Sequence, residues 1–137
     1  MPLMGEGWST KMPKIIVNEV KDYLLRKEKE EALLKEQIRN QTISELKSLN
    51  HLWEKYKCDK VYLYGSFLDL TFDTHSDIDL AVEPELNFAD QLKLYDEINK
   101  KIKREVEIRL LTELPFSEKI KREGIIIYER KDSNPQK

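Results

Sequence analysis

The alternation of polar and apolar residues at 77–82 is the feature that most restricts the fold. Alternate side chains of an extended strand lie on the same face, so Asp77 and Asp79 are predicted to project together. Ile78 and Leu80 are then predicted to point into a core. Two carboxylates held in parallel on a rigid strand predict a magnesium site, because this ion takes a few carboxylates and fills its other positions with water and phosphate oxygens.

A second strand is predicted just upstream, at residues 61–64, and Gly65 and Ser66 follow it directly. If this pair opens a helix, its backbone N–H groups can bind phosphate oxygens. A spacer of ten residues separates Ser66 from Asp77. The glycine-serine pair and the two aspartates therefore predict a site for a magnesium-bound nucleotide.

The spacing of Gly65-Ser66 and Asp77-x-Asp79 resembles the nucleotidyltransferase superfamily of the polymerase-beta type, in particular the minimal nucleotidyltransferases. The similarity covers roughly residues 42–131, because 106–108 resembles the family's third strand and 120–128 its closing helix and strand. The resemblance implies a strand, turn and helix that present the Gly-Ser backbone to a triphosphate. It also implies three carboxylates that bind two metal ions for in-line attack on the α-phosphorus.

Glu107 is the third carboxylate that the resemblance implies, on a predicted strand at 105–110. Arg109 shares its face of the strand and is predicted to contact the nucleotide, while Glu105 is the alternative ligand. The family usually has aspartate in place of Glu107, and the extra methylene displaces the oxygen by about one bond length, a shift that matters in catalysis. The alternative is that Glu107 and Arg109 form a solvent-exposed pair.

The loop after Ser66 also departs from the family, whose members commonly carry lysine or arginine a few residues later. This chain has Asp69 there, and no lysine or arginine occurs between Gly65 and Leu86. Two magnesium ions, the backbone amides of the turn and Arg109 would then have to balance the triphosphate of ATP.

Composition restricts the possible partners. The chain has 137 residues, enough for one domain, and its 24 basic and 26 acidic side chains give a formal charge of −2. Direct binding to nucleic acid or to an anionic membrane is therefore not expected. The single cysteine, Cys58, excludes an internal disulfide, and we expect it to be a small, partly buried side chain. No apolar run is long enough to span a membrane and no secretory signal is present, so we expect a cytoplasmic protein.

Pattern changes along the chain predict its organisation. Ile16, Val20 and Leu24 recur at helical spacing, which predicts an N-terminal helix that packs on a second subunit or a partner, or alternatively on its own domain. The predicted segments are a flexible lead at 1–12, a helical arm at 13–41, a minimal nucleotidyltransferase domain at 42–131 and a polar tail at 132–137.

Within the domain we expect an α/β (α+β) fold in which helices flank a small mixed sheet. Residues 42–45 read as a capping box that starts a helix, and Asn87 is predicted to cap another with Asp90. Gly124 suits the end of the last helix. The apolar positions predicted to cover one face of the sheet are Leu46, Leu49, Leu52, Trp53 and Tyr56 of the first helix. The second helix is predicted from apolar residues at helical spacing, namely Phe88, Leu92, Tyr95, Ile98 and Ile102.

The predicted reaction transfers AMP from ATP to a hydroxyl and releases pyrophosphate. Asp77 and Asp79 would hold both metal ions, Glu107 would bind the catalytic one, and Gly65 and Ser66 would position the phosphates. The resemblance further implies an antitoxin whose partner is a helical HEPN-type toxin with a tyrosine as the acceptor. The alternatives are an antitoxin that acts by binding alone, with a degenerate nucleotide site, and an enzyme that adenylylates a small molecule such as an aminoglycoside.

Overall fold

The structure is a computed structural model and describes residues 14–131, so the predicted lead at 1–12 and tail at 132–137 lie outside it. Contacts divide the chain into two units, Met1–Gln37 and Ile38–Lys137, which are described separately. The elements are α2 (Lys14–Lys47), α3 (Asn50–Lys55), β1 (Lys60–Tyr64), α4 (Ser66–Asp69), β2 (Ile78–Glu83), α5 (Phe88–Lys101), β3 (Val106–Leu110), η1 (Leu111–Glu113), α6 (Ser117–Glu123) and β4 (Ile125–Glu129).

The described part of the N-terminal unit, residues 14–37, is helical as predicted and belongs to α2. Its large apolar side chains are exposed: Ile16, Val20, Tyr23, Leu24, Leu25, Leu33 and Leu34. Lys27 and Glu31 interrupt the apolar stripe, so the heptad pattern of a coiled coil is not met. Packing of this arm on a second subunit or a partner stays a prediction.

Helix α2 continues through Thr42, so the prediction that a new helix starts there is wrong. Residues 38–41 contain no glycine or proline to end the helix. The Glu45 carboxylate accepts a hydrogen bond from Gln41 Nε2 at 3.4 Å, one turn earlier in the same helix. Thr42 is a buried residue within α2. The apolar stripe that follows does enter the core as predicted, with Leu46, Leu49, Leu52, Trp53 and Tyr56 all buried.

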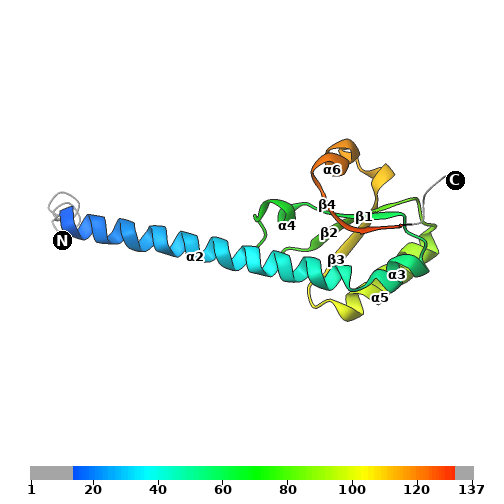
Figure 1. The fold of residues 1–137 in the computed structure, drawn as a ribbon, viewed down its shortest axis with the longest axis horizontal. Coiled ribbons are helices and arrows are strands. Elements are labelled where there is room, and N and C mark those ends of the chain that lie inside the picture. Colours follow the sequence, from blue (N-terminus) through cyan, green and yellow to red (C-terminus); the bar gives the residue numbers. More distant parts are fainter. Residues whose placement is uncertain (1–13, 132–137) are drawn as a thin grey trace, which may run out of the picture. The chain divides into compact units, whose positions relative to one another are not determined.

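The four strands form one mixed sheet, as predicted, and their order in the sheet is β3-β2-β1-β4 (Figure 1). Strand β1 is antiparallel to both β2 and β4, whereas β2 and β3 are parallel. The register places Asp79 opposite Tyr64 on one side and opposite Glu107 on the other. Residues from three different strands are therefore brought side by side near one end of these strands.

The two faces of the sheet are covered unequally. One face packs against the end of α2, α3 and α5 in the main core, which includes Ile78, Leu80 and Val82 as predicted. The other face has a smaller cluster formed by Tyr62, Ala81, Leu111, Leu114 and Ile120, from two strands, η1 and α6. Alternation along the strands puts Asp79 and Glu107 on this second, less covered face. The carboxylates therefore have access to solvent and ligands.

Helix α5 begins as predicted, because the Asp90 backbone N–H donates to Asn87 Oδ1 at 2.8 Å. Its apolar residues at helical spacing do not all enter the core. Leu94 and Ile98 are buried, but Phe88 is 74% exposed and Leu92 52% exposed. Gln91 takes the position facing the sheet in the first turns, where its Nε2 donates to the Ile108 carbonyl at 3.1 Å, and this turns the neighbouring apolar side chains outward.

The structure shows the environment of the single cysteine, Cys58. Cys58 is fully buried in the main core, more deeply than the partial burial expected, and its burial raises the thiol pKa to about 12. A thiol with such a pKa stays protonated at neutral pH and is a poor nucleophile.

Among residues 14–131, no helix is both long and apolar enough to cross a membrane.

Candidate active site

Gly65 makes the turn at the end of β1 in a conformation that other residues avoid, with φ 80° and ψ −149°. A Cβ added to Gly65 would overlap the Oδ2 atom of Asp79. Glycine is thus needed here both for its backbone angles and for the close approach of the main chain to a carboxylate. The predicted pairing of the glycine turn with the aspartate strand is present in the structure.

Ser66 opens α4, which is a single turn that ends at Asp69. The turn is held by Phe67, which is buried and stacks on Phe72 with ring centroids 4.0 Å apart. Because α4 is so short, few peptide dipoles add up along its axis. Its N-terminus therefore attracts anions more weakly than the N-terminus of a longer helix would. Positive charge for a phosphate must then come mainly from side chains or metal ions.

A cluster of negative charge lies where β2 and β3 pair, close to the Gly65 turn. It consists of Asp77, Asp79 and Glu107. Asp79 is half-buried and lies opposite Glu107, while Asp77 is exposed one residue before β2 begins. The pKa of Asp79 is raised to about 6, first by burial and then by the negative charges of Glu107 and Asp77. The three predicted ligands are therefore close enough to repel one another.

Glu107 and Glu105 differ in what their carboxylates contact. Glu107 Oε2 accepts a hydrogen bond from Arg109 Nη2 at 3.0 Å on the same face of β3. Glu105 lies just before β3, and its carboxylate accepts a hydrogen bond from the Tyr95 hydroxyl on α5. Glu107, which lies opposite Asp79, is therefore the better third ligand, and Arg109 is engaged with it.

All three candidate ligands are carboxylates, which are the ligands that a hard divalent cation prefers. The strand register also places Asp79 opposite Glu107. A cation placed there would also relieve the repulsion that raises the pKa of Asp79. Within residues 14–131, however, no three Asp, Glu, His or Cys side chains are already arranged to hold a metal. Binding of a metal ion would therefore require some of these side chains to change position.

Arg104 is a functional candidate that the sequence did not reveal. Its Nη1 atom donates to the carbonyls of Asp73 and Ser76 at 2.7 and 3.0 Å. The guanidinium also lies over the Phe67 ring, 5.0 Å from its centroid. Arg104 thereby holds the loop that precedes Asp77. The contacting residues are about thirty positions apart in the sequence, so no local sequence pattern predicts this contact.

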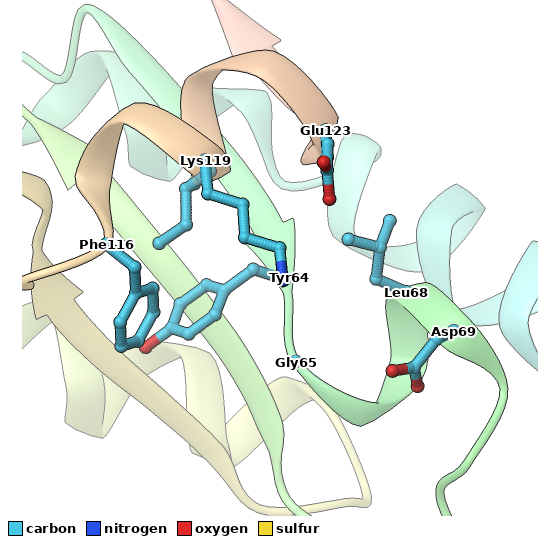
Figure 2. A pocket seen from close by; sticks show the side chains of 8 residues that line it. Tyr64, Gly65, Leu68, Asp69, Phe116, Lys119 and Glu123 are labelled. Atoms are coloured by element: carbon cyan, nitrogen blue, oxygen red, sulfur yellow. The ribbon is translucent and has the colours of Figure 1, made fainter.

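A pocket of about 580 Å³ opens beside Gly65 (Figure 2). Tyr64 and Phe116 form an aromatic wall, with ring centroids 6.0 Å apart. Burial and the nearby charge of Asp79 raise the pKa of Tyr64 to about 12, so its hydroxyl stays protonated. The pocket is lined by Tyr64, Gly65, Leu68, Asp69, Phe116, Lys119, Ile120 and Glu123.

The contribution of α6 to this pocket was not predicted from the sequence. The available signal was the spacing of Phe116, Lys119 or Ile120, and Glu123, which recur at three- and four-residue intervals on one side of a helix. Nothing local indicated that this side faces Gly65. That relation depends on β4 pairing with β1.

Comparison with known families agrees with this arrangement. Residues 47–133 match the family described as Polymerase beta, Nucleotidyltransferase, which covers more than half of the chain. The chain belongs to this nucleotidyltransferase family. The predicted fold class is confirmed as well, with a four-stranded mixed sheet and a long N-terminal helix.

Two solved structures share the fold. A toxin-antitoxin crystallised with AMP-PNP is 20% identical, with a TM-score of 0.50, and the match covers 62% of this chain and 73% of that one. A mutant of the toxin-antitoxin MntA-HpeT is 17% identical, with a TM-score of 0.52, covering 64% and 76%. At these identities the likeness shows the fold alone. A search of curated proteins finds no match.

Asp79→Asn is expected to stabilise the metal-free protein at about pH 8. The pKa of Asp79 is about 6 in the folded protein against an ordinary 3.8, so folding is disfavoured as pH rises through this window and the penalty persists above it. After discounting for solvent screening of this half-exposed group, removing the charge should gain about 1 kcal/mol, or roughly 3–5 °C in melting temperature.

Thermal unfolding without metal at about pH 8 and about pH 4.5 checks this prediction, and the gain should be smaller at the lower pH. Asp73→Asn is the control, because hydrogen bonding from the His75 backbone N–H lowers the pKa of Asp73 and removing its charge should give no gain. An Asp79→Asn gain of equal size at both pH values would contradict the assigned cause.

Proposed function

We propose that this chain is a magnesium-dependent nucleotidyltransferase that moves AMP from ATP to a hydroxyl, acting as the antitoxin of a HEPN-type toxin whose tyrosine is the acceptor. The observation that carries the proposal is the position of the Asp79 carboxylate, which lies against the Gly65 turn and opposite Glu107. Membership of the nucleotidyltransferase family supports the reaction class. Similarity in fold to toxin-antitoxin structures supports the choice of partner.

In the proposed reaction an acceptor oxygen forms a bond to the α-phosphorus, and the bond from that phosphorus to the bridging oxygen breaks. Pyrophosphate leaves with the electron pair, and the acceptor proton passes to the nearby Glu107 carboxylate. Asp77, Asp79 and Glu107 would hold magnesium, which would neutralise charge on the phosphates. The backbone of Gly65 and Ser66 would align the phosphates, and Arg109, once released from Glu107, would contact them.

A protein acceptor is supported by an exposed apolar stripe on α5, whose one end, at Tyr95, lies near the acidic residues. Phe88, Leu92 and Tyr95 lie on one side of this helix, and each is at least 37% exposed. Tyr95 bonds to Glu105, and the charges of Asp77 and Glu107 reach its hydroxyl and help to raise its pKa. A partner that covers this stripe would place its own side chains beside the reacting groups.

Phe88→Ser combined with Leu92→Ser is therefore expected to weaken the complex with the partner by about a hundredfold. Each large apolar side chain buried at an interface typically contributes about 1–2 kcal/mol. Calorimetric titration of the partner encoded beside this chain measures the loss. Ile126→Ser is the matched control, because Ile126 is also exposed but lies on β4, at the opposite edge of the sheet. Equal losses for both variants would place the interface elsewhere.

The proposed reaction is tested by incubating the protein with that partner, magnesium and ATP, and then measuring the intact mass of both chains. The partner is expected to gain one or more AMP units on a tyrosine. No gain on either chain, with ATP and magnesium in excess, would reject AMP transfer to this partner.

Binding without catalysis is the second candidate, and the ion pair that occupies Glu107 favours it. The two candidates differ in ligand-induced stabilisation. ATP with magnesium at about 100 times its dissociation constant should add about 2.7 kcal/mol to the unfolding free energy of an intact site. The absence of any shift, with and without the partner, would favour neutralisation by contact alone.

A further inference from the structure

Lys119 differs from the other basic side chains of α6. Lys121 lies 3.9 Å from both Glu83 and Glu118, and Arg122 lies 3.7 Å from Glu123. Lys119 forms no ion pair among the described residues, 14–131. Figure 2 shows its side chain extending from α6 across the pocket toward Tyr64 at the end of β1.

The two carboxylates that share the pocket with Lys119 have partners of their own. Asp69 Oδ1 accepts hydrogen bonds from the Thr71 hydroxyl at 2.7 Å and the Thr71 backbone N–H at 3.2 Å. These bonds, and to a lesser extent the positive charge of Lys119, lower the pKa of Asp69. Glu123 faces Arg122. The pocket therefore contains one ammonium group whose charge is not taken up by a close ion pair within the described chain.

A triphosphate beside Gly65 needs positive charge that the surrounding segment does not supply. No lysine or arginine occurs between residues 65 and 86, α4 is a single turn, and Arg109 is engaged with Glu107. Gly65 both lines the pocket and touches Asp79. A chain of phosphates whose α-phosphorus lies at the carboxylates can therefore pass Gly65 and enter the pocket with its far end.

We propose that Lys119 is a phosphate-binding residue that contacts the β- and γ-phosphates of the nucleotide in the pocket beside Gly65. This inference rests on the proposed nucleotidyltransferase function and names the residue that replaces the missing basic side chain of the loop. A lysine acts on phosphate as a mobile point charge, and the long side chain of Lys119 suits an approach from a neighbouring helix. Lys119 thus supplies the positive charge that the loop lacks, because this chain has Asp69 where the family commonly has lysine or arginine.

Calorimetric titration of the full-length chain with magnesium tripolyphosphate and with adenosine tests this assignment. Lys119→Ala should weaken tripolyphosphate binding by about tenfold or more, the loss of one charge-assisted contact, and leave adenosine binding unchanged. Lys119→Arg should restore most of the affinity. Lys121→Ala is the matched control, since Lys121 is on the same helix but pairs with Glu83 and Glu118, and it should bind like the wild type.

The outcomes separate this inference from the proposed function. Tripolyphosphate binding that Lys119→Ala leaves unchanged, or that Lys121→Ala weakens equally, overturns the role of Lys119 even if the wild type transfers AMP. Loss of binding specific to Lys119→Ala supports the phosphate site even if no AMP reaches the partner, which would reject the transfer reaction alone. A wild-type chain that binds no tripolyphosphate overturns the phosphate site itself.

Discussion

Asp77→Ala combined with Asp79→Ala is expected to abolish AMP transfer to the partner, with a rate loss of at least about a thousandfold. Carboxylates that hold catalytic metal ions contribute several kcal/mol of transition-state stabilisation, and each 1.4 kcal/mol is about tenfold in rate. Removing both aspartates leaves Glu107 alone in the cluster, which is too few ligands for a divalent cation. The measurement is the rate of AMP incorporation into the partner by intact mass.

The double variant should keep its fold, because Asp77 is exposed and the half-buried Asp79 carries a charge whose removal is favourable at neutral pH. Circular dichroism and thermal unfolding check this point. Asp96→Ala is the control, since Asp96 is an exposed aspartate on α5 that pairs with Lys100 at 3.1 Å. Transfer by the double variant at more than a tenth of the wild-type rate would remove Asp77 and Asp79 from the catalytic site.

Gly65→Ala is expected to lower the unfolding free energy by about 2–4 kcal/mol and to abolish detectable ATP binding. A side chain at φ 80° and ψ −149° is strained, and the new methyl group would overlap the Asp79 carboxylate. Relief of that overlap would push the turn away from Asp79 and separate the phosphate-binding backbone from the metal ligands. Chemical denaturation and calorimetric titration with magnesium ATP measure the two effects.

A double-mutant cycle isolates the close approach from the backbone strain. In an Asp79→Ala background the overlapping oxygen is gone, so Gly65→Ala should cost clearly less than it does in the wild type. Part of the cost should remain, since the unfavourable φ is unchanged. An equal cost in both backgrounds would show that the turn and the Asp79 carboxylate are not in contact.

Much of the fold was predictable because the periodic signals were strong and local. The alternation around Asp79 predicted a strand with one buried face, and the apolar run before Gly65 predicted its neighbour. Asn87 and Asp90 marked the start of α5 correctly. The cap-like pattern at Thr42 was misleading, because a capping sequence without a helix breaker before it can lie inside a continuous helix.

Features of the site that depend on strand order were less predictable. The position of Glu107 opposite Asp79 depends on the third strand pairing with the second, and its exposed ion pair with Arg109 corresponds to the alternative that the sequence left open. Lys119 and Arg104 reach the site from distant segments, and their positions follow from β4 pairing with β1 and from packing on Phe67. Such contacts carry no periodic signature in the sequence.

The outward turn of Phe88 and Leu92 was missed for a related reason. Helical spacing identifies which apolar residues share a side but does not say which of two neighbouring stripes faces the sheet. Here the polar side chain of Gln91 bonds to the Ile108 carbonyl and fixes the rotation of α5. The exposed stripe then becomes available to a partner beside the site.

The most direct test of the proposed site is a crystal structure of the full chain grown with manganese and a non-hydrolysable ATP analogue, with manganese located by anomalous scattering. We predict manganese bound by carboxylate oxygens of Asp77, Asp79 and Glu107, and phosphates of the analogue against the Gly65 turn. Manganese found elsewhere, or Glu107 still paired with Arg109 while the analogue is bound, would contradict the proposed metal site.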